Sequence, residues 1–263
     1  GLREPRSLII DTDCGLDDLA TLALAAAVSA PLRLVTTTSG LAPHGHGHLL
    51  ARRMLNHVGL ESVPVVAGAE APPPSTVREK QAWENSYGLR VAEVTREMGC
   101  ETTFCDHLAR RDPCDAGAAA KAIVETAQAA GGGTTILALG ALTNLAEAVR
   151  RQPEDFLHLV QRVVIIADTD PSRPSYNAAL DPAALRVVVG SGVQIVLVGS
   201  SCYPRPAWVA ALFAESGMGV ACSAGGKSDL GKRRRSDGTT QICGDSAAAA
   251  TALRVLGGID PYS

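Results

Sequence analysis

Four carboxylates fall within eight residues near the start of the chain: Asp11, Asp13, Asp17 and Asp18. Asp11 and Asp13 follow a short apolar run and share one face of an extended segment, whereas Asp17 and Asp18 fall in the first turn of a predicted helix. Carboxylates this close repel one another unless something compensates, and a hard divalent cation does so by accepting several oxygen ligands. Helix capping accounts for Asp17 and Asp18 equally well, so the metal interpretation depends mainly on Asp11 and Asp13.

Apolar runs alternate with helical patterns along the chain. Predicted strands are Leu8–Thr12, Leu32–Thr38, Pro64–Ala67, Thr134–Gly140, Arg162–Ala167 and Val193–Gly199; predicted helices are Leu16–Ser29, Gly47–Val58, Ala116–Ala130, Asn144–Arg151, Pro182–Val189, Pro206–Ser216 and Ser246–Leu256. This alternation predicts an α/β fold, Rossmann-like, with a mostly parallel central sheet and helices on both faces. We expect a single domain over residues 1–263, with ligands at the carboxyl ends of the strands, where the acidic turn lies.

Composition narrows the function classes. The 263 residues are 46% hydrophobic with a formal net charge of −3, which suits a globular core and gives no basic field for nucleic acid. No apolar run approaches the ~20 residues that span a bilayer, so we expect no membrane partner. The first residues lack the pattern of a secretion signal, and the seven cysteines are irregularly spaced. We therefore expect a cytoplasmic protein with reduced thiols.

Three motifs together resemble a known family. They are Asp-x-Asp-x-Gly-x-Asp-Asp at 11–18, Gly-x-Leu-Thr-Asn-x-Ala at 140–146, and Tyr-Asn-x-x-x-Asp-Pro-x-Ala at 176–184. The chain is similar to the calcium-dependent nucleoside hydrolases, the inosine-uridine preferring N-ribohydrolase family. The resemblance implies the nucleoside hydrolase fold. It also implies hydrolysis of the N-glycosidic bond of a nucleoside or nucleotide-like substrate, releasing base and (phospho)ribose.

The resemblance also implies a metal site. Calcium would be held by Asp13, Asp18, Asp245 and the backbone carbonyl of Leu139, which precedes the second motif. Asp13 would in addition take a proton from the attacking water as general base. Asp11 would lie behind Asp13 and orient it.

Substrate-binding residues follow from the same resemblance. Asp17 and Asn177 would hold ribose hydroxyls. Trp83 and Tyr87 lie in a polar stretch of a chain with only 3% aromatic residues, and they could stack on the base. They serve equally well as anchors that hold a loop in place.

Three positions depart from the family pattern. Leu41 replaces an Asn, Ser175 a Glu and Gly244 a His, and each loses a polar group that the family directs at sugar or base. Losing such groups typically costs orders of magnitude on the usual substrate. A second hypothesis is therefore a relative that keeps calcium and a ribosyl-type ligand but catalyses elimination or isomerisation, or only binds.

Two further segments, residues 44–48 and 227–235, each allow more than one interpretation. His44, His46 and His48 suggest a solvated loop more than a transition-metal site, although some could face the substrate. The basic stretch 227–235 suggests a solvated loop, or a flap whose arginines hold a substrate phosphate. By resemblance we expect a homodimer or homotetramer.

Overall fold

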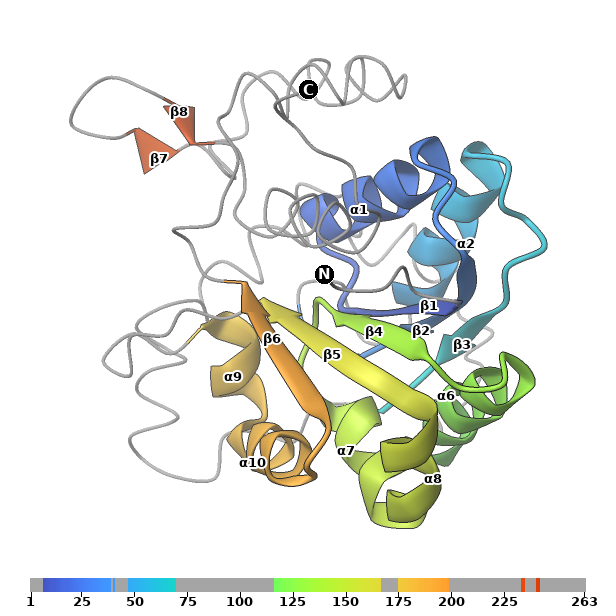
Figure 1. The fold of residues 1–263 in the computed structure, drawn as a ribbon. Helices are drawn as coiled ribbons and strands as arrows, with labels where there is room; N and C mark the ends of the chain where they lie inside the picture. Colours follow the sequence, from blue (N-terminus) through green and yellow to red (C-terminus); the bar gives the residue numbers. More distant parts are fainter. Residues whose placement is uncertain are drawn as a thin grey trace, which may run out of the picture.

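A six-stranded parallel sheet forms the centre of the computed structural model, which describes residues 7–38, 40, 47–69, 116–166, 175–198, 233–234 and 240–241. The strands are β1 (Ser7–Thr12), β2 (Leu32–Thr37), β3 (Val65–Ala67), β4 (Thr134–Ala138), β5 (Val160–Ile166) and β6 (Gln194–Val198). Their order in the sheet is β3-β2-β1-β4-β5-β6, the doubly wound Rossmann order (Figure 1). The predicted fold class is confirmed, and each predicted strand is present with its ends shifted by one or two residues.

Helices follow the strands in the alternation that the sequence predicts. They are α1 (Leu16–Ala27), α2 (Gly47–His57), α6 (Ala116–Ala129), α7 (Thr143–Arg151), α8 (Pro153–Leu159), α9 (Tyr176–Leu180) and α10 (Pro182–Gly190). Helices α8 and α9 were not predicted from the sequence, and α7 begins one residue before its predicted start. The predicted helices 206–216 and 246–256 lie outside the described residues.

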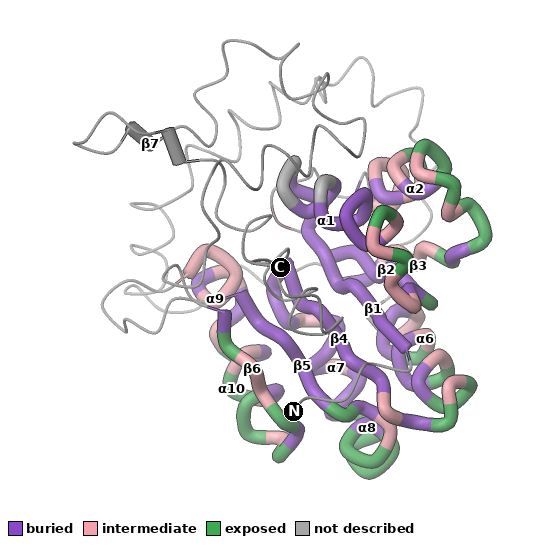
Figure 2. Tube along the Cα trace, turned by 45° about the horizontal axis from the view of Figure 1, so that its top comes forward, coloured by how far each residue is buried: buried purple, intermediate pink, exposed green. Residues whose placement is uncertain are grey.

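Successive side chains of β1 point to opposite faces of the sheet, and the apolar core therefore has two layers. Leu8 and Ile10 belong to an apolar cluster that also contains Leu22 of α1 and Leu55 of α2. Ile9 points the other way, into a second cluster formed with α6, α7, α8 and α10. Figure 2 shows β1 and β4 buried along their lengths. Burial on both faces explains why the middle of each strand, Leu8–Ile10 in β1 and Ile136–Ala138 in β4, is apolar.

The carboxyl ends of four neighbouring strands are joined by backbone hydrogen bonds. Leu139 N, after β4, donates to Asp11 O at 2.7 Å, and Thr38 N, after β2, donates to Thr12 O at 2.9 Å. Gly68 N, after β3, donates to Thr37 O at 2.8 Å. The acidic turn after β1 is therefore held between the ends of β2 and β4.

A small antiparallel pairing lies within the carboxyl-terminal third of the chain. Strand β7 (Arg233–Arg234) pairs with β8 (Thr240–Gln241). These residues include two arginines of the basic stretch, for which the sequence analysis predicted no strand. Among the described helices, none has the length and apolar character needed to cross a membrane.

Candidate active site

Three carboxylates are buried where β1 ends. Asp11, in the strand itself, has 0% of its surface exposed; Asp13, in the turn, has 2%; and Asp18, in the first turn of α1, has 1%. Burying charged groups is costly unless they are hydrogen-bonded or bind a cation. Asp17 also lies in α1, but the structure describes only its backbone and not its side chain.

Asp11 is held on the α7 side of the sheet. Its Oδ1 accepts hydrogen bonds from Thr36 Oγ1 at 2.6 Å and from Asn144 Nδ2 at 2.7 Å. Its Oδ2 is buried and has no hydrogen-bond partner among the described residues. Burial raises the pKa of Asp11 to about 7, the charge of Asp13 adds to the rise, and the two hydrogen bonds oppose it. Without a bound cation, this carboxyl group therefore takes up a proton near neutral pH.

Asp18 is held on the opposite side of the sheet. Thr12, which alternation directs away from Asp11, donates through Oγ1 to Asp18 Oδ2 at 2.7 Å. The same Oγ1 accepts from Cys14 N at 2.9 Å. Cys14 has the left-handed backbone conformation at φ 59°, unusual for a residue with a side chain, and this reverses the chain between Asp13 and α1.

Cys14 itself is a buried free thiol. Its Sγ donates to Gly47 O, at the start of α2, at 3.1 Å. Burial raises the pKa of this thiol well above its usual value, and the charges of Asp18 and Asp13 add to the effect. The thiol therefore stays protonated and anchors the acidic turn to α2. The other six cysteines lie outside the described residues.

Backbone from two other strand ends lies directly against Asp13. Gly15 N donates to Asp13 Oδ1 at 3.3 Å. A Cβ on Gly40 would lie 2.1 Å from Asp13 Oδ2, and a Cβ on Gly140 would lie 2.9 Å from Asp13 N. Both positions therefore require glycine, and this close packing fixes where Asp13 lies.

Leu139 and Asn177 meet across the sheet edge. Asn177, in the short helix α9, donates through Nδ2 to the backbone carbonyl of Leu139. Its Oδ1 is buried without a hydrogen-bond partner in the described part of the chain, and so is Ser175 Oγ. Asp181 caps α10 by accepting from Ala184 N at 2.9 Å, as the sequence predicts, and it also accepts from Thr143 Oγ1 at 2.9 Å.

The structure thus gathers part of the predicted site. It brings Asp11, Asp13, Asp18, Leu139 and Asn177 to one edge of the sheet. Other predicted positions lie outside the described residues: Leu41, His44, His46, Trp83, Tyr87, Gly244 and Asp245. Within the described ranges, no group of three or more His, Cys, Asp or Glu side chains is arranged to hold a metal ion.

Sequence reasoning missed the residues that position these groups. Thr12, Thr36 and Gly40 were not singled out, and Gly140 and Asn144 were quoted only as part of a motif. A polar residue at the end of a buried apolar strand was an available signal, because buried polar groups need partners. Nothing in the sequence showed that Thr36 reaches Asp11.

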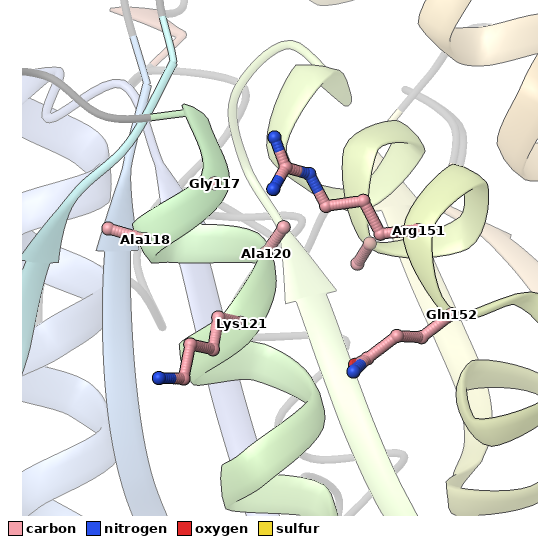
Figure 3. A pocket seen from close by; sticks show the side chains of 7 residues that line it. Gly117, Ala118, Ala120, Lys121, Arg151 and Gln152 are labelled. Atoms are coloured by element: carbon pink, nitrogen blue, oxygen red, sulfur yellow. The ribbon is translucent and has the colours of Figure 1, made fainter.

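A pocket of about 490 Å³ lies elsewhere, between α6 and α7. Figure 3 shows Arg151 reaching from α7 toward Gly117 on α6, with Lys121 and Gln152 also at its wall. Arg151 Nε donates to Glu147 Oε1 at 2.6 Å. The lining contains none of the acidic residues, so this pocket is separate from the candidate active site.

A parallel sheet with buried carboxylates at its carboxyl edge is typical of α/β proteins that bind ligands at the carboxyl ends of the strands. A family model described as inosine-uridine preferring nucleoside hydrolase matches residues 8–254. The chain belongs to this family. The expectation drawn from the three motifs is thereby confirmed.

Curated relatives agree with this membership. The chain is 30% identical over 207 residues to the pyrimidine-specific ribonucleoside hydrolase RihB of Escherichia coli (strain SE11), covering 74% of this chain. It is 32% identical over 201 residues to the non-specific ribonucleoside hydrolase RihC of Klebsiella pneumoniae subsp. pneumoniae, covering 73% of this chain. In each case the match spans 60% of the relative's length.

Solved structures agree on the fold. An inosine-guanosine nucleoside hydrolase superposes with a TM-score of 0.66 at 21% identity, covering 97% of this chain and 80% of that one. The inosine-uridine preferring nucleoside hydrolase of Bacillus anthracis gives a TM-score of 0.62 at 17% identity, covering 95% and 81%. The nucleoside hydrolase fold is thus confirmed.

Proposed function

We propose that this protein is a calcium-dependent hydrolase that cuts the N-glycosidic bond of a nucleoside or nucleotide-like substrate. The observation that carries the proposal is the burial of Asp11, Asp13 and Asp18 together where β1 ends. Family membership and the activities named for the two curated relatives support it. We further infer a single domain over residues 1–263, a homodimer or homotetramer, and a cytoplasmic location.

The available donor atoms suit calcium. Asp13 and Asp18 would supply carboxylate oxygens, Leu139 a backbone carbonyl oxygen, and Asp245, outside the described residues, a third carboxylate. Calcium prefers oxygen ligands of these types over nitrogen and sulfur. When bound, calcium lowers the pKa of a coordinated water and so supplies a nucleophile near neutral pH.

The chain's own residues would do the rest of the chemistry. Glycosidic cleavage passes through an oxocarbenium-like transition state and needs an activated water. Asp13, fixed by Gly15 N and by the glycines packed against it, takes the proton from that water. Asp11 would lie behind Asp13 and orient it, as the resemblance implies.

Substrate would be held on the opposite side of the site. Asn177 Oδ1 is a buried acceptor without a donor in the described structure, so it suits a ribose hydroxyl. Asp17 would hold a second hydroxyl. Trp83 and Tyr87, outside the described residues, would stack on the leaving base.

Chromatographic detection of free base tests this function. Purified protein would be incubated with calcium and a panel of purine and pyrimidine nucleosides and their 5′-monophosphates. We expect release that a chelator abolishes and that Asp13→Asn lowers by about 10²–10⁴-fold, because the general base is lost. Asp155→Asn, an identical change at an exposed position on α8, is the matched control and leaves the rate unchanged.

Three outcomes contradict the proposal. If free base is still released in the presence of chelator, the reaction does not require calcium. If free base is still released at the wild-type rate by Asp13→Asn, Asp13 is not the general base. No release from any panel member, with calcium bound, favours the alternative in which the losses at Leu41, Ser175 and Gly244 accompany another reaction or binding alone.

A further inference from the structure

Asn144 makes more contacts among the strand ends than any role so far described explains. It lies in the first turn of α7 and has 0% of its surface exposed. Its Nδ2 donates to Asp11 Oδ1 at 2.7 Å and to Thr37 O at 3.1 Å, and its Oδ1 accepts from Ala69 N at 2.8 Å. One side chain therefore joins the ends of β1, β2 and β3 to the start of α7.

These contacts fix the orientation of the amide. The two acceptors meet the nitrogen and the single donor meets the oxygen, so the reversed amide would place its oxygen against two other oxygens. The space is also closed, since a Cβ on Gly68 would lie 2.2 Å from Asn144 Oδ1. Asn144 consequently has one arrangement compatible with its surroundings.

The contact with Asp11 is directional as well. Thr36 and Asn144 approach the same oxygen, Oδ1, from β2 and from α7. Two donors on one oxygen fix the rotation of the carboxylate and hence the direction of Oδ2. The orientation of the Asp11 carboxylate therefore depends on a residue 133 positions away in the sequence.

We propose that Asn144 is a positioning residue of the active site: it orients Asp11 and holds the ends of β2 and β3 against it, so that Asp13 keeps its place. This inference rests on the proposed function. Asn144 need not touch calcium or substrate. Its effect passes through Asp11 and through the strand end that leads to Gly40.

Asn144→Ser removes the donation to Asp11 and Thr37 O without adding a charge. We expect calcium binding, measured by titration calorimetry, to weaken about tenfold, and kcat to fall about 10–100-fold, as for residues that support metal ligands. The control is Ile123→Val in α6, a fully buried apolar core position. It lowers the melting temperature but leaves calcium affinity and kcat unchanged.

An exchanged pair separates positioning from simple packing. Asp11→Asn combined with Asn144→Asp keeps the volume and restores an amide–carboxylate hydrogen bond, but it moves the carboxylate from β1 to α7. Because a carboxylate at position 144 still faces Thr37 O, we expect this double variant to recover only part of the melting temperature lost in Asn144→Asp alone, without recovering calcium affinity or kcat. It also provides a folded variant should Asn144→Ser not fold.

Each outcome decides the inference. If the exchanged pair regains calcium affinity and kcat together with stability, Asn144 has only a packing role and the inference is overturned. The inference is also overturned if Asn144→Ser behaves like the Ile123→Val control. Both results require a wild-type protein that binds calcium and releases base, so the proposed function would still stand. A wild-type protein that does neither overturns the proposed function first, and this inference with it.

Discussion

The two sides of the site differ in how completely their polar groups are used. At the end of β1, Asp11, Asp13 and Asp18 are at most 2% exposed, and donors from β2, β1 and α7 hold their oxygens in place. In the segment from Ser175 to Asp181 the side chains of Ser175 and Asn177 are only partly buried, and each has a buried oxygen without a partner among the described residues.

This difference separates two kinds of requirement. The acidic side must keep like charges in fixed positions, so it is closely packed and tolerates little change. The Asn177 side keeps unused acceptors, as suits a surface that is completed by a ligand. One of the three departures from the family pattern, Ser175, also lies on this side. Substitutions on the two sides should therefore have unequal effects.

The largest effect on activity is expected from Gly40→Ala. Its Cβ would lie 2.1 Å from Asp13 Oδ2, so either Asp13 or the backbone must move. A displacement of about 1 Å at a reacting group costs roughly a hundredfold in rate, and we expect at least this loss in kcat/KM. The control is Gly190→Ala, where no atom lies within 4 Å of the new Cβ. Equal activity in the two variants would show that Asp13 is not held by this packing.

The largest effect on stability is expected from Asp11→Asn, measured as the unfolding free energy in chelator. Burial raises the Asp11 pKa to about 7, above the value of 3.8 for the unfolded chain, so the folded state binds the proton more tightly. Its contribution to stability is full below pH 3.8 and is lost as the pH rises to about 7. The asparagine variant keeps Oδ1 as acceptor for Thr36 and Asn144 and removes this loss.

The quantity to measure is the difference in unfolding free energy between the Asp11→Asn variant and the wild type as a function of pH. Asp11→Asn should gain stability relative to wild type by about 4 kcal/mol between pH 4 and pH 7, and by no more above that range. Urea unfolding across this range measures it. A difference that stays constant with pH would mean that the Asp11 carboxyl group is ionised throughout.

The smallest effect is expected from Ser175→Ala. Ser175 Oγ is buried without a partner in the described structure, so its removal should change the unfolding free energy by less than about 0.5 kcal/mol. Thr36→Val is the matched loss of a hydroxyl on the acidic side, and it should cost about 1–3 kcal/mol because it removes a donor from Asp11. Equal costs in urea unfolding would remove the contrast between the two sides.

Much of the fold was predictable because the signals are local. Every strand in the six-stranded sheet contains a short, mostly apolar run that can be recognised without knowing its neighbours. The cap at Asp181 followed from Asp-Pro at a helix start. Helix α8 was missed although Pro153 and Glu154 carry the same kind of signal, since its seven residues are too few to establish a helical period.

The candidate site was predictable only in its acidic residues and motif positions. The resemblance named Asp13, Asp18, Leu139 and Asn177, and the structure places them at one sheet edge. The contacts of Asn144 could not be anticipated, because an asparagine near a helix start is ordinarily explained as a local cap. Here Leu142 precedes the helix as its cap residue, and the Asn144 amide is directed across the sheet.

The sequence by itself determined the family, the parallel α/β fold and the position of the carboxylates, since these depend on residue types and short spacings. Only the tertiary structure decided which groups fix those carboxylates. Thr36 lies 25 positions from Asp11 and Asn144 lies 133 positions from it, and only strand order and register bring them to one oxygen. Hydrogen bonds act over about 3 Å in space, so their partners depend on how the strands pair and not on distance along the chain.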